Sequence, residues 1–405
     1  MNDVTIECKY AGVSIGGDTS NELDKAAHVT MNNSTITLNA DLAKNKYSQE
    51  IGCVIAGYGA QIKVNDSTLS SNVHIASICS GDGNCVIEIN DCTIVHNPVD
   101  QTYEAYEFYD EGSILFSHHV STKEDLAAAF AVGGMITLEA DIALDQALVL
   151  DNGKNVTIDL NSHILTMANV ANNYAAVIKN GTLTIEGEGT VIVPGIYGFG
   201  TASDTTTGHI VINGGNFVGE QAVYLFSCYN GSITINDGNF TADFCVLNNF
   251  DSDGNGHTMT GTATVRGGTF EVTGDTSYAI LAGEFAETNI EGEPVYIIHK
   301  ACNLFSAVGY GGKAVLSEDV VLTEDSYAID VYANVTIDLN GHNMTLSDSV
   351  TVFEGVTLTI EGEGEVSANG DCVFMTEVDA QIIVNGGSFA DNIFQDGCNV
   401  ADNRE

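Results

Sequence analysis

The chain has 405 residues, of which 44% are hydrophobic, and a formal net charge of −43 from 55 acidic and only 12 basic residues. So few lysines and arginines argue against nucleic-acid binding, which depends on cationic contacts to phosphates, and against binding to an anionic membrane surface. The ordinary apolar content argues against a disordered acidic tail, and the length predicts several domains or a repeat architecture.

The N-terminus reads Met-Asn-Asp-Val-Thr-Ile-Glu-Cys and lacks the basic start and apolar core of a secretory signal. No apolar run approaches the ~20 residues that a membrane span needs. We therefore expect a protein that is made in a cytosol and is not inserted into a membrane. If it reaches the outside, we expect it to do so by lysis, by assembly into a particle, or by a route that is not encoded at its N-terminus. The ten cysteines include no C-x-x-C pair, and we expect most of them to be small buried hydrophobes.

A short phrase recurs along the chain, beginning in residues 1–97. It has an alternating apolar strand, a polar corner at Asn-Gly or Asn-Asp, and a second short strand that opens on an apolar residue. The copies lie at 29–36, 62–69, 87–94, 210–217, 233–240, 263–270 and 382–389. Neighbouring copies within a group are 23 to 33 residues apart. Periods of this length in a strand-only repeat predict a β-solenoid, whose coils bury an apolar face by stacking.

Residues 98–120 interrupt this pattern. Pro98 is followed by an acidic and aromatic run that includes Tyr103 and Tyr106. This segment is either a linker with an exposed lateral contact surface or a strip packed over a solenoid face. His118 and His119 follow, and on a strand two adjacent side chains point to opposite faces, which argues against a metal site shared by both.

Residues 121–131 are the best predicted helix, with Ser121 or Thr122 as N-cap and an acidic first turn. Gly133 and Gly134 end it, and strands follow immediately. We expect this helix to cap a solenoid module by covering open strand edges.

The same order of sequence motifs begins again near residue 295. Residues 311–322 match 133–144, and the phrase Asn-Val-Thr-Ile-Asp-Leu-Asn-Gly-His at 334–342 matches 155–163. The phrase Thr-Leu-Thr-Ile-Glu-Gly-Glu-Gly occurs identically at 182–189 and 357–364. The predicted domains are therefore an N-terminal solenoid segment, a linker, a first module with its capping helix, and a shortened second module, at 1–97, 98–120, 121–294 and 295–405.

These motifs, in this order, resemble the right-handed parallel β-helix proteins of the pectate-lyase-like superfamily. They are most similar to non-enzymatic members in bacteriophage fibres and in adhesin-like surface proteins. The resemblance covers residues 115–405 well and 25–97 loosely. It implies an all-β fold, a right-handed parallel β-helix with a short capping helix and a duplicated module.

One candidate metal site stands out. Asp251, Asp253 and Asn255 occupy the first half of a calcium-loop pattern, D-x-D-x-N-G, but the twelfth position holds Thr262 instead of an acid. The loop is therefore either a Ca²⁺ site or a solvated excursion, and we expect no cofactor, with Ca²⁺ as the one alternative that this loop leaves open. Ser80–Asn84 is a similar loop with less support.

No residue is assigned a catalytic role. Lyases of the resembled superfamily use a basic residue near carboxylates, and the only arginines are Arg266 and Arg404. Arg266 replaces the corner Asn of one phrase, so we expect it to pair with neighbouring acids. The recurring pairs Glu186/Glu188 and Glu361/Glu363 lie in a structural motif, which favours a structural role over hydrolysis.

The leading hypothesis is a structural and binding protein of a virion, such as a phage head or tail fibre or decoration protein. The expected partners are other virion or surface proteins, host surface glycans, and further copies of the chain, with a trimer as the first expectation. One alternative is a cell-surface adhesin-like protein. The other, from the enzyme class, is a tailspike-type polysaccharide depolymerase.

Overall fold

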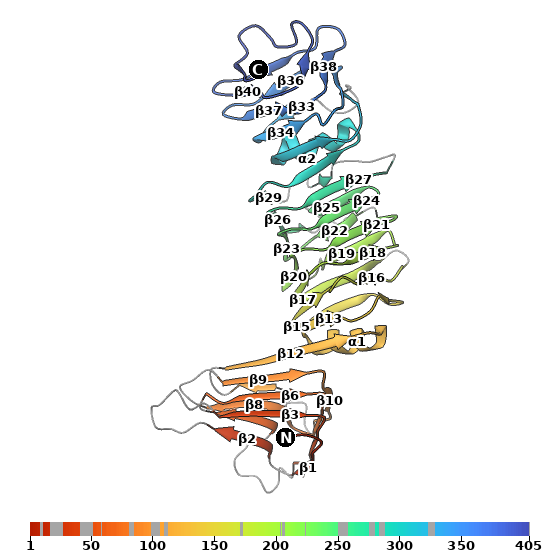
Figure 1. The fold of residues 1–405 in the computed structure, drawn as a ribbon, viewed down its shortest axis with the longest axis vertical. Coiled ribbons are helices and arrows are strands. Elements are labelled where there is room, and N and C mark those ends of the chain that lie inside the picture. Colours follow the sequence, from red (N-terminus) through yellow and green to blue (C-terminus); the bar gives the residue numbers. More distant parts are fainter. Residues whose placement is uncertain are drawn as a thin grey trace. The chain divides into compact units, whose positions relative to one another are not determined.

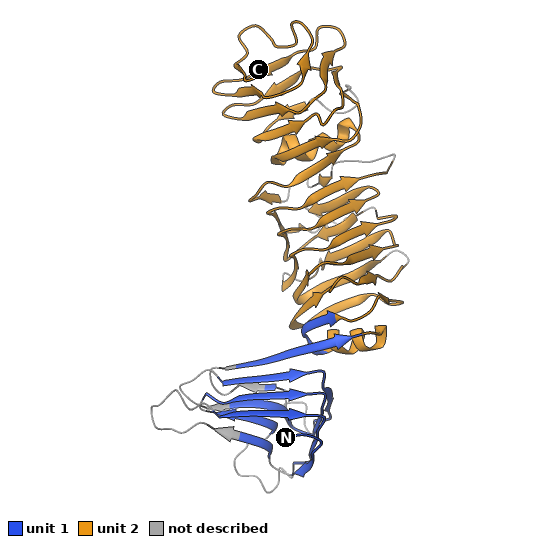
Figure 2. Cartoon of the chain, viewed as in Figure 1, with its two compact units in different colours: residues 1–120, 132–137 blue, residues 121–131, 138–405 orange. Residues whose placement is uncertain are grey.

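The computed structural model shows an all-β protein, a right-handed parallel β-helix with two short α-helices (Figure 1). The structure describes residues 1–8, 11–16, 27–40, 52–57, 59–80, 85–98, 106–108, 112–170, 173–202, 204, 207–222, 224–249, 258–274, 280–282, 288–322 and 329–404. The chain divides into two compact units, residues 1–120 with 132–137, and residues 121–131 with 138–405 (Figure 2). The parallel pairing of the strands confirms the predicted fold class.

The first unit is a three-sided solenoid in which each side is a parallel sheet. One sheet contains β1 (Thr5–Cys8), β4 (Thr35–Leu38), β7 (Thr68–Ser71) and β10 (Thr93–His96). The second contains β2 (Ala11–Gly16), β5 (Gly52–Gly57), β8 (His74–Ser80) and β11 (Tyr106–Phe108). The third contains β3 (His28–Asn32), β6 (Gln61–Asn65), β9 (Cys85–Asn90), β12 (Gly112–Val120) and β13 (Gly134–Leu138).

Two of these strands lie within the predicted linker 98–120. Tyr106 of β11 pairs with Ala76 of β8, and β12 pairs with β9 over six residues. The ring of Tyr106 packs edge-on against Phe116, with 4.7 Å between centroids. These contacts place the described residues 106–108 and 112–120 in the sheets of the solenoid, and Tyr103 lies outside the described residues. The domain boundaries at 97, 120 and 294 stay predictions.

The second unit contains a sheet of twelve parallel strands that belong to both modules. They are β14 (Ile142–Ala143), β16 (Ile164–Thr166), β18 (Thr190–Val193), β21 (Asn216–Gly219), β24 (Asn239–Ala242), β27 (Thr269–Val272), β30 (Val295–Ile298), β31 (Gly312–Leu316), β34 (Val335–Asp338), β37 (Thr357–Glu361), β40 (Gln381–Val384) and β42 (Val400–Asp402).

The other sides of this unit differ between the modules. In the first module they contain β15 (Leu148–Asp159), β17 (Tyr174–Glu186), β19 (Tyr197–Thr201), β22 (Tyr224–Cys228), β25 (Cys245–Asn249) and β28 (Leu281–Ala282), and the branch β20 (Thr207–Ile212), β23 (Ser232–Ile235), β26 (Thr262–Val265) and β29 (Thr288–Ile290). In the second they contain β32 (Val320–Leu322), β35 (Met344–Leu346), β38 (Glu365–Ala368) and β41 (Ser388–Phe389), and a sheet of β33 (Ile329–Val331), β36 (Val350–Val352) and β39 (Phe374–Thr376).

Each copy of the repeated phrase is a strand, a corner and a second strand, as predicted. In the copy at 62–69, β6 ends at Asn65, Asp66 adopts a left-handed backbone with φ of 49°, and β7 begins at Thr68. In the copy at 210–217, Gly215 has φ of 95° at the same corner. Asn, Asp and Gly tolerate this backbone conformation better than other residues, which explains why they recur there.

The core consists of the inward side of alternating strand residues, stacked coil on coil. The last residues of three copies of the phrase form an aromatic ladder together with Tyr296. Phe217, Phe240, Phe270 and Tyr296 occupy equivalent positions on β21, β24, β27 and β30. Centroids of successive rings lie 5.3, 5.0 and 6.0 Å apart, and all four side chains are fully buried. Stacking and burial of these rings stabilise the first module along its axis.

The predicted capping helix is α1 (Lys123–Val132), and Thr122 is its N-cap. The backbone N–H of Asp125 donates to Thr122 Oγ1 over 3.1 Å. The helix ends at Val132, and the two residues that follow, Gly133 and Gly134, have φ of 90° and 95°. A second helical segment, η2 (Ala301–Asn303) followed by α2 (Leu304–Tyr310), was not predicted. It stands 178 residues after α1, the offset that relates 133–144 to 311–322, so the duplication includes the helix.

The second helix marks a change in how the coils stack. In the first module the twelve-stranded sheet contains the strand that follows each polar corner, such as β21 and β24. After α2 the same sheet continues with strands that precede the corner, namely β31, β34, β37 and β40. The second module is therefore stacked on the first with its strands shifted by one side of the coil, and α2 packs against β30, β31 and β33 at this junction.

Candidate functional site

The predicted calcium residues Asp251, Asp253 and Asn255 lie outside the described residues, as do residues 81–84 of the second loop. Within the described ranges, no group of three or more His, Cys, Asp or Glu side chains is placed to hold a metal ion. Calcium binding stays a prediction. In the same part of the chain, neither helix is long and apolar enough to cross a bilayer.

The polar corners of the first unit form a continuous ladder of side-chain amides. Asn65 Nδ2 donates to Asn32 Oδ1 over 2.7 Å, and Asn90 Nδ2 donates to Asn65 Oδ1 over 2.9 Å. The ladder ends at Ser117, whose hydroxyl donates to Asn90 Oδ1 over 2.7 Å. Because each amide bonds the next coil, these corners fix the register of the stack and leave little hydrogen-bonding capacity for a ligand.

Arg266 occupies a rung of the corresponding ladder in the second unit. Its Nη1 donates to Asn236 Oδ1 over 3.0 Å, and its Nε lies 2.7 Å from Glu291 Oε2. Asn236 in turn donates to Asn213 over 2.7 Å. The predicted pairing of Arg266 with neighbouring acids is confirmed. Arg404 binds Asp402 and lies over the ring of Phe389, so both arginines have structural partners.

The duplicated phrase Asp-Leu-Asn-Gly/Ser-His forms the same turn in both modules. Asn161 and Asn340 adopt φ of 46° and 48°. The backbone N–H of each donates to the preceding aspartate, over 2.9 Å to Asp159 Oδ1 and 3.0 Å to Asp338 Oδ1. The side-chain amide of Asn340 donates a hydrogen bond to Leu316 O of the neighbouring coil over 3.0 Å. These residues therefore form corners between successive strands of one coil, and their amides bond to the neighbouring coil.

His118 and His119 point to opposite faces of β12, as strand alternation predicts. His118 is buried, and burial lowers the pKa of its imidazole. His119 is exposed, and its Nδ1 lies 2.9 Å from Asp91 Oδ2. The two rings do not converge on a common ligand.

One cluster was not anticipated from the sequence, because its members lie on three different coils. His299 Nε2 lies 2.8 Å from Glu271 Oε1, and His299 Nδ1 lies 2.9 Å from Ser317 Oγ. This is the order of an acyl-transfer triad. However, the Ser317 hydroxyl donates to Ile298 O over 3.0 Å, which directs its proton away from the imidazole. We conclude that the cluster is an inter-coil ladder, extended by Thr241, which donates to Glu271 Oε2 over 3.3 Å.

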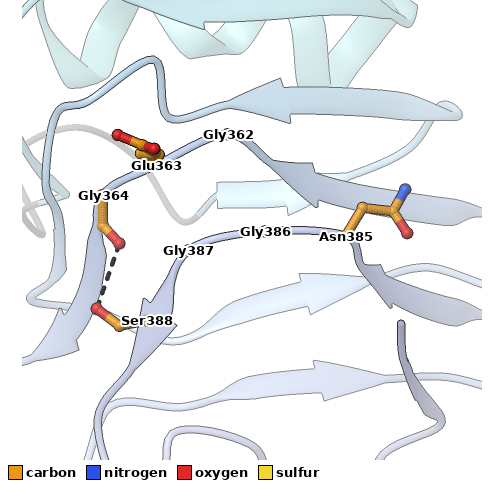
Figure 3. A pocket seen from close by; sticks show the side chains of 7 residues that line it. All are labelled: Gly362, Glu363, Gly364, Asn385, Gly386, Gly387 and Ser388. Atoms are coloured by element: carbon orange, nitrogen blue, oxygen red, sulfur yellow. Dashed lines mark hydrogen bonds between the residues drawn. The ribbon is translucent and has the colours of Figure 1, made fainter. Parts of the chain in front are cut away.

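A hollow of about 480 Å³ lies where the corner Glu-Gly-Glu-Gly at 361–364 meets the corner Asn-Gly-Gly at 385–387 (Figure 3). Glycine is required because Gly362 and Gly387 adopt φ of 81° and 75°, and a Cβ on Gly386 would approach Gly362 O to 2.5 Å. Ser388 Oγ donates to Gly364 O over 3.3 Å across the hollow. Its walls are mostly backbone, so it follows from close packing of two glycine corners.

A larger groove of about 560 Å³ lies at the junction marked by α2. One wall is the turn around Gly292 and Glu293, another is the end of α2 at Tyr310, and the floor is the outer face of β31, β34 and β37. Gly312 makes this arrangement feasible, since its φ is 114° and a Cβ there would approach Pro294 O to 2.5 Å. The backbone that follows α2 at Gly312 can therefore pack directly against the neighbouring coil.

The groove contains a lysine with two acidic partners. Lys313 Nζ lies 2.8 Å from Asp338 Oδ2 and 2.9 Å from Glu361 Oε1. Hydrogen bonds to these two carboxylates raise the pKa of the Lys313 ammonium, so it stays charged at neutral pH. Of the recurring acids, Glu361 thus has a cation partner, while Glu363 is exposed beside the hollow in Figure 3.

Comparisons with known proteins found no match to this chain among protein-family profiles, curated protein sequences or solved structures. The parallel β-solenoid is established by the strand pairing alone.

Proposed function

We propose that this chain is a structural and binding protein, displayed outward on a particle or cell surface, and first of all a virion component such as a fibre or decoration protein. In this proposal its β-helix is related to the pectate-lyase-like superfamily through its non-enzymatic members.

The observation that supports this proposal most directly is the use of polar corners in ladders between coils. In the described residues, the corner amides of Asn32, Asn65 and Asn90 and the side chain of Arg266 bond to neighbouring coils. When polar side chains hold neighbouring coils in register, the stack of coils is rigid, which suits a structural role. The high negative charge adds solubility and mutual repulsion between displayed copies.

The test is to locate the protein in its native context. Particles purified from a culture of the source are separated by density gradient and examined by mass spectrometry, and an antibody against the chain is used for immunogold labelling. Labelling of the outside of particles supports the proposal. Labelling confined to the cell envelope favours the adhesin-like alternative and overturns the virion assignment.

An enzyme assay on the same material tests the remaining alternative. The purified chain is incubated with host surface polysaccharide, and reducing ends and unsaturated sugars are measured. Release of either product that persists after rigorous purification identifies a depolymerase and overturns the proposed structural role. The association state is measured by light scattering, where a mass of three chains supports the trimer expectation and a monomer contradicts it.

A further inference from the structure

We propose that the groove at the module junction binds a neutral, hydroxyl-rich oligosaccharide. This inference deepens the proposed binding role and rests on it, but it concerns one site of the second unit and can fail independently of where the protein is displayed. The site comprises the outer face of β31, β34 and β37, the end of α2 and the turn before β30.

The floor of the groove carries two partly exposed threonine hydroxyls, those of Thr336 and Thr359. Thr336 on β34 pairs in register with Thr359 on β37, so their side chains point outward from adjacent coils at the same position. Both side chains are half-buried, and neither hydroxyl has a protein hydrogen-bond partner within the described residues. Adjacent strands are ~4.8 Å apart, a step close to the length of one sugar unit in an extended chain. Hydroxyl groups on successive sugar units can therefore meet the hydroxyls of Thr336 and Thr359 in turn.

Groups fixed by the protein flank this row of two threonines. Asn334 is exposed, and its Oδ1 accepts the backbone N–H of Thr357 over 2.8 Å, which holds the side-chain NH₂ in one orientation. Lys313 on β31 pairs in register with Thr336, so it continues the row on the next coil, and it is held there by Asp338 and Glu361. A ring, that of Tyr310, contributes to one wall. Few mobile groups need to be ordered on binding, which reduces its entropic cost.

The charge of the groove selects against acidic sugars. The single ammonium of Lys313 is shared by two carboxylates, and the exposed Glu293 adds a third at the rim. The whole chain carries −43. A uronate or sialate would therefore meet net repulsion, whereas hydroxyl groups can donate to Glu361 and accept from Asn334 without bringing charge.

The first module provides a matched control. Its outward threonines Thr157 and Thr184 pair in register on β15 and β17, and they correspond to Thr336 and Thr359 in the duplicated phrases. However, the counterpart of Lys313 at the 178-residue offset is Met135. The same Thr→Val changes can therefore be made on an equivalent strand pair that lacks the lysine.

The experiment measures binding of neutral oligosaccharides of three to six units to the full chain by saturation-transfer NMR and calorimetry, with uronic-acid oligosaccharides of equal length as comparison. A shallow polar groove predicts a Kd on the order of 1 mM for the neutral ligand. The double variant T336V/T359V keeps β-branched side chains and is expected to bind at least tenfold more weakly. The control variant T157V/T184V is expected to bind like the unmodified chain.

Melting temperatures show that the variants are folded before binding is compared. Absence of neutral-sugar binding overturns the inference, as does binding that survives T336V/T359V or is lost equally in T157V/T184V. Acidic oligosaccharides that bind as tightly as neutral ones also overturn it. Any of these results leaves the particle-location test of the structural role untouched.

Discussion

Lys313 on β31 reaches across β34 to Glu361 on β37, and its Nζ lies 2.9 Å from Glu361 Oε1. One side chain thus links three successive coils at the start of the second module, because it also binds Asp338 on β34 over 2.8 Å. The corresponding residue of the first module is Met135, so this clamp is specific to the second copy.

The substitution Lys313→Met is expected to destabilise the second module by about 0.5–1 kcal/mol, because partly exposed ion pairs contribute little each and the two acids are left facing one another. Chemical denaturation at low and high NaCl measures the effect, which should shrink with salt. Lys63→Met is the control, since Lys63 has one exposed partner, Glu88, at 3.1 Å. If both variants lost the same amount of stability, or if the loss in Lys313→Met did not change with salt, Lys313 would not act as an electrostatic link between the coils.

Phe240 is the central rung of the aromatic ladder, stacked between Phe217 and Phe270. Phe240→Ala is expected to cost about 3–5 kcal/mol, because it removes a fully buried ring and leaves a cavity between coils. Phe240→Leu should cost less. The measurement is denaturant unfolding together with hydrogen exchange of the amides in β21 and β27.

Thr234→Ala on β23 serves as the matched control for the ladder, since Thr234 is half-buried on the outer face. It should change stability by no more than about 0.5 kcal/mol. If Phe240→Ala and Thr234→Ala were equally mild, the ladder would not be a main source of stability.

The repeated phrase was sufficient to predict the strand–corner–strand unit, because it combines a period-two apolar pattern with residues that tolerate positive φ. Asp66 and Gly215 stand at such corners. The alternation also placed His118 and His119 on opposite faces correctly. In each case the cause is local, within one or two residues of the position.

The features that sequence reasoning missed depend on which coils lie next to each other. The helix α2 has weak intrinsic signals, since Leu304–Tyr310 lacks an acidic first turn and a side-chain N-cap. The 178-residue offset from α1 was the signal that could have revealed it. Glu271, His299 and Ser317 meet only because the strands stack in a particular register, and the groove around Lys313 arises from the shift of strands at the junction.

The buried cysteines are expected to be unreactive in the native state. Burial raises the pKa of Cys53 to about 12 and those of Cys92 and Cys228 to about 11. At pH 8 the thiolate fraction of Cys53 is then about 10⁻⁴. Cys372 and Cys398 are partly exposed and should react first with maleimide.

The measurement for the cysteines is mass spectrometry of alkylated peptides over time. Labelling of Cys53 and Cys228 should be at least about 100-fold slower than labelling of Cys372 and should become fast in denaturant. Fast native labelling of Cys53 would show that the first unit opens readily around β5.

His118 is expected to make the first unit sensitive to acid. Its ring is buried, its Nε2 has no hydrogen-bond partner in the described chain, and burial lowers its pKa below the ordinary value of 6.5 despite the opposing effects of the Gly133 backbone and of Asp91. The unfolded chain therefore binds a proton as pH falls through about 6.5, whereas the folded chain does not. Stability should decline from that pH downward and level off below the folded-state pKa of His118.

The variant His118→Asn removes the titrating ring, so the stability difference between it and the unmodified chain should narrow as pH falls from about 8 to 5. His119→Asn, on the same strand but exposed, controls for loss of an imidazole, and parallel pH profiles for the unmodified chain and His118→Asn would show that proton exclusion at His118 is not what makes this unit acid-sensitive.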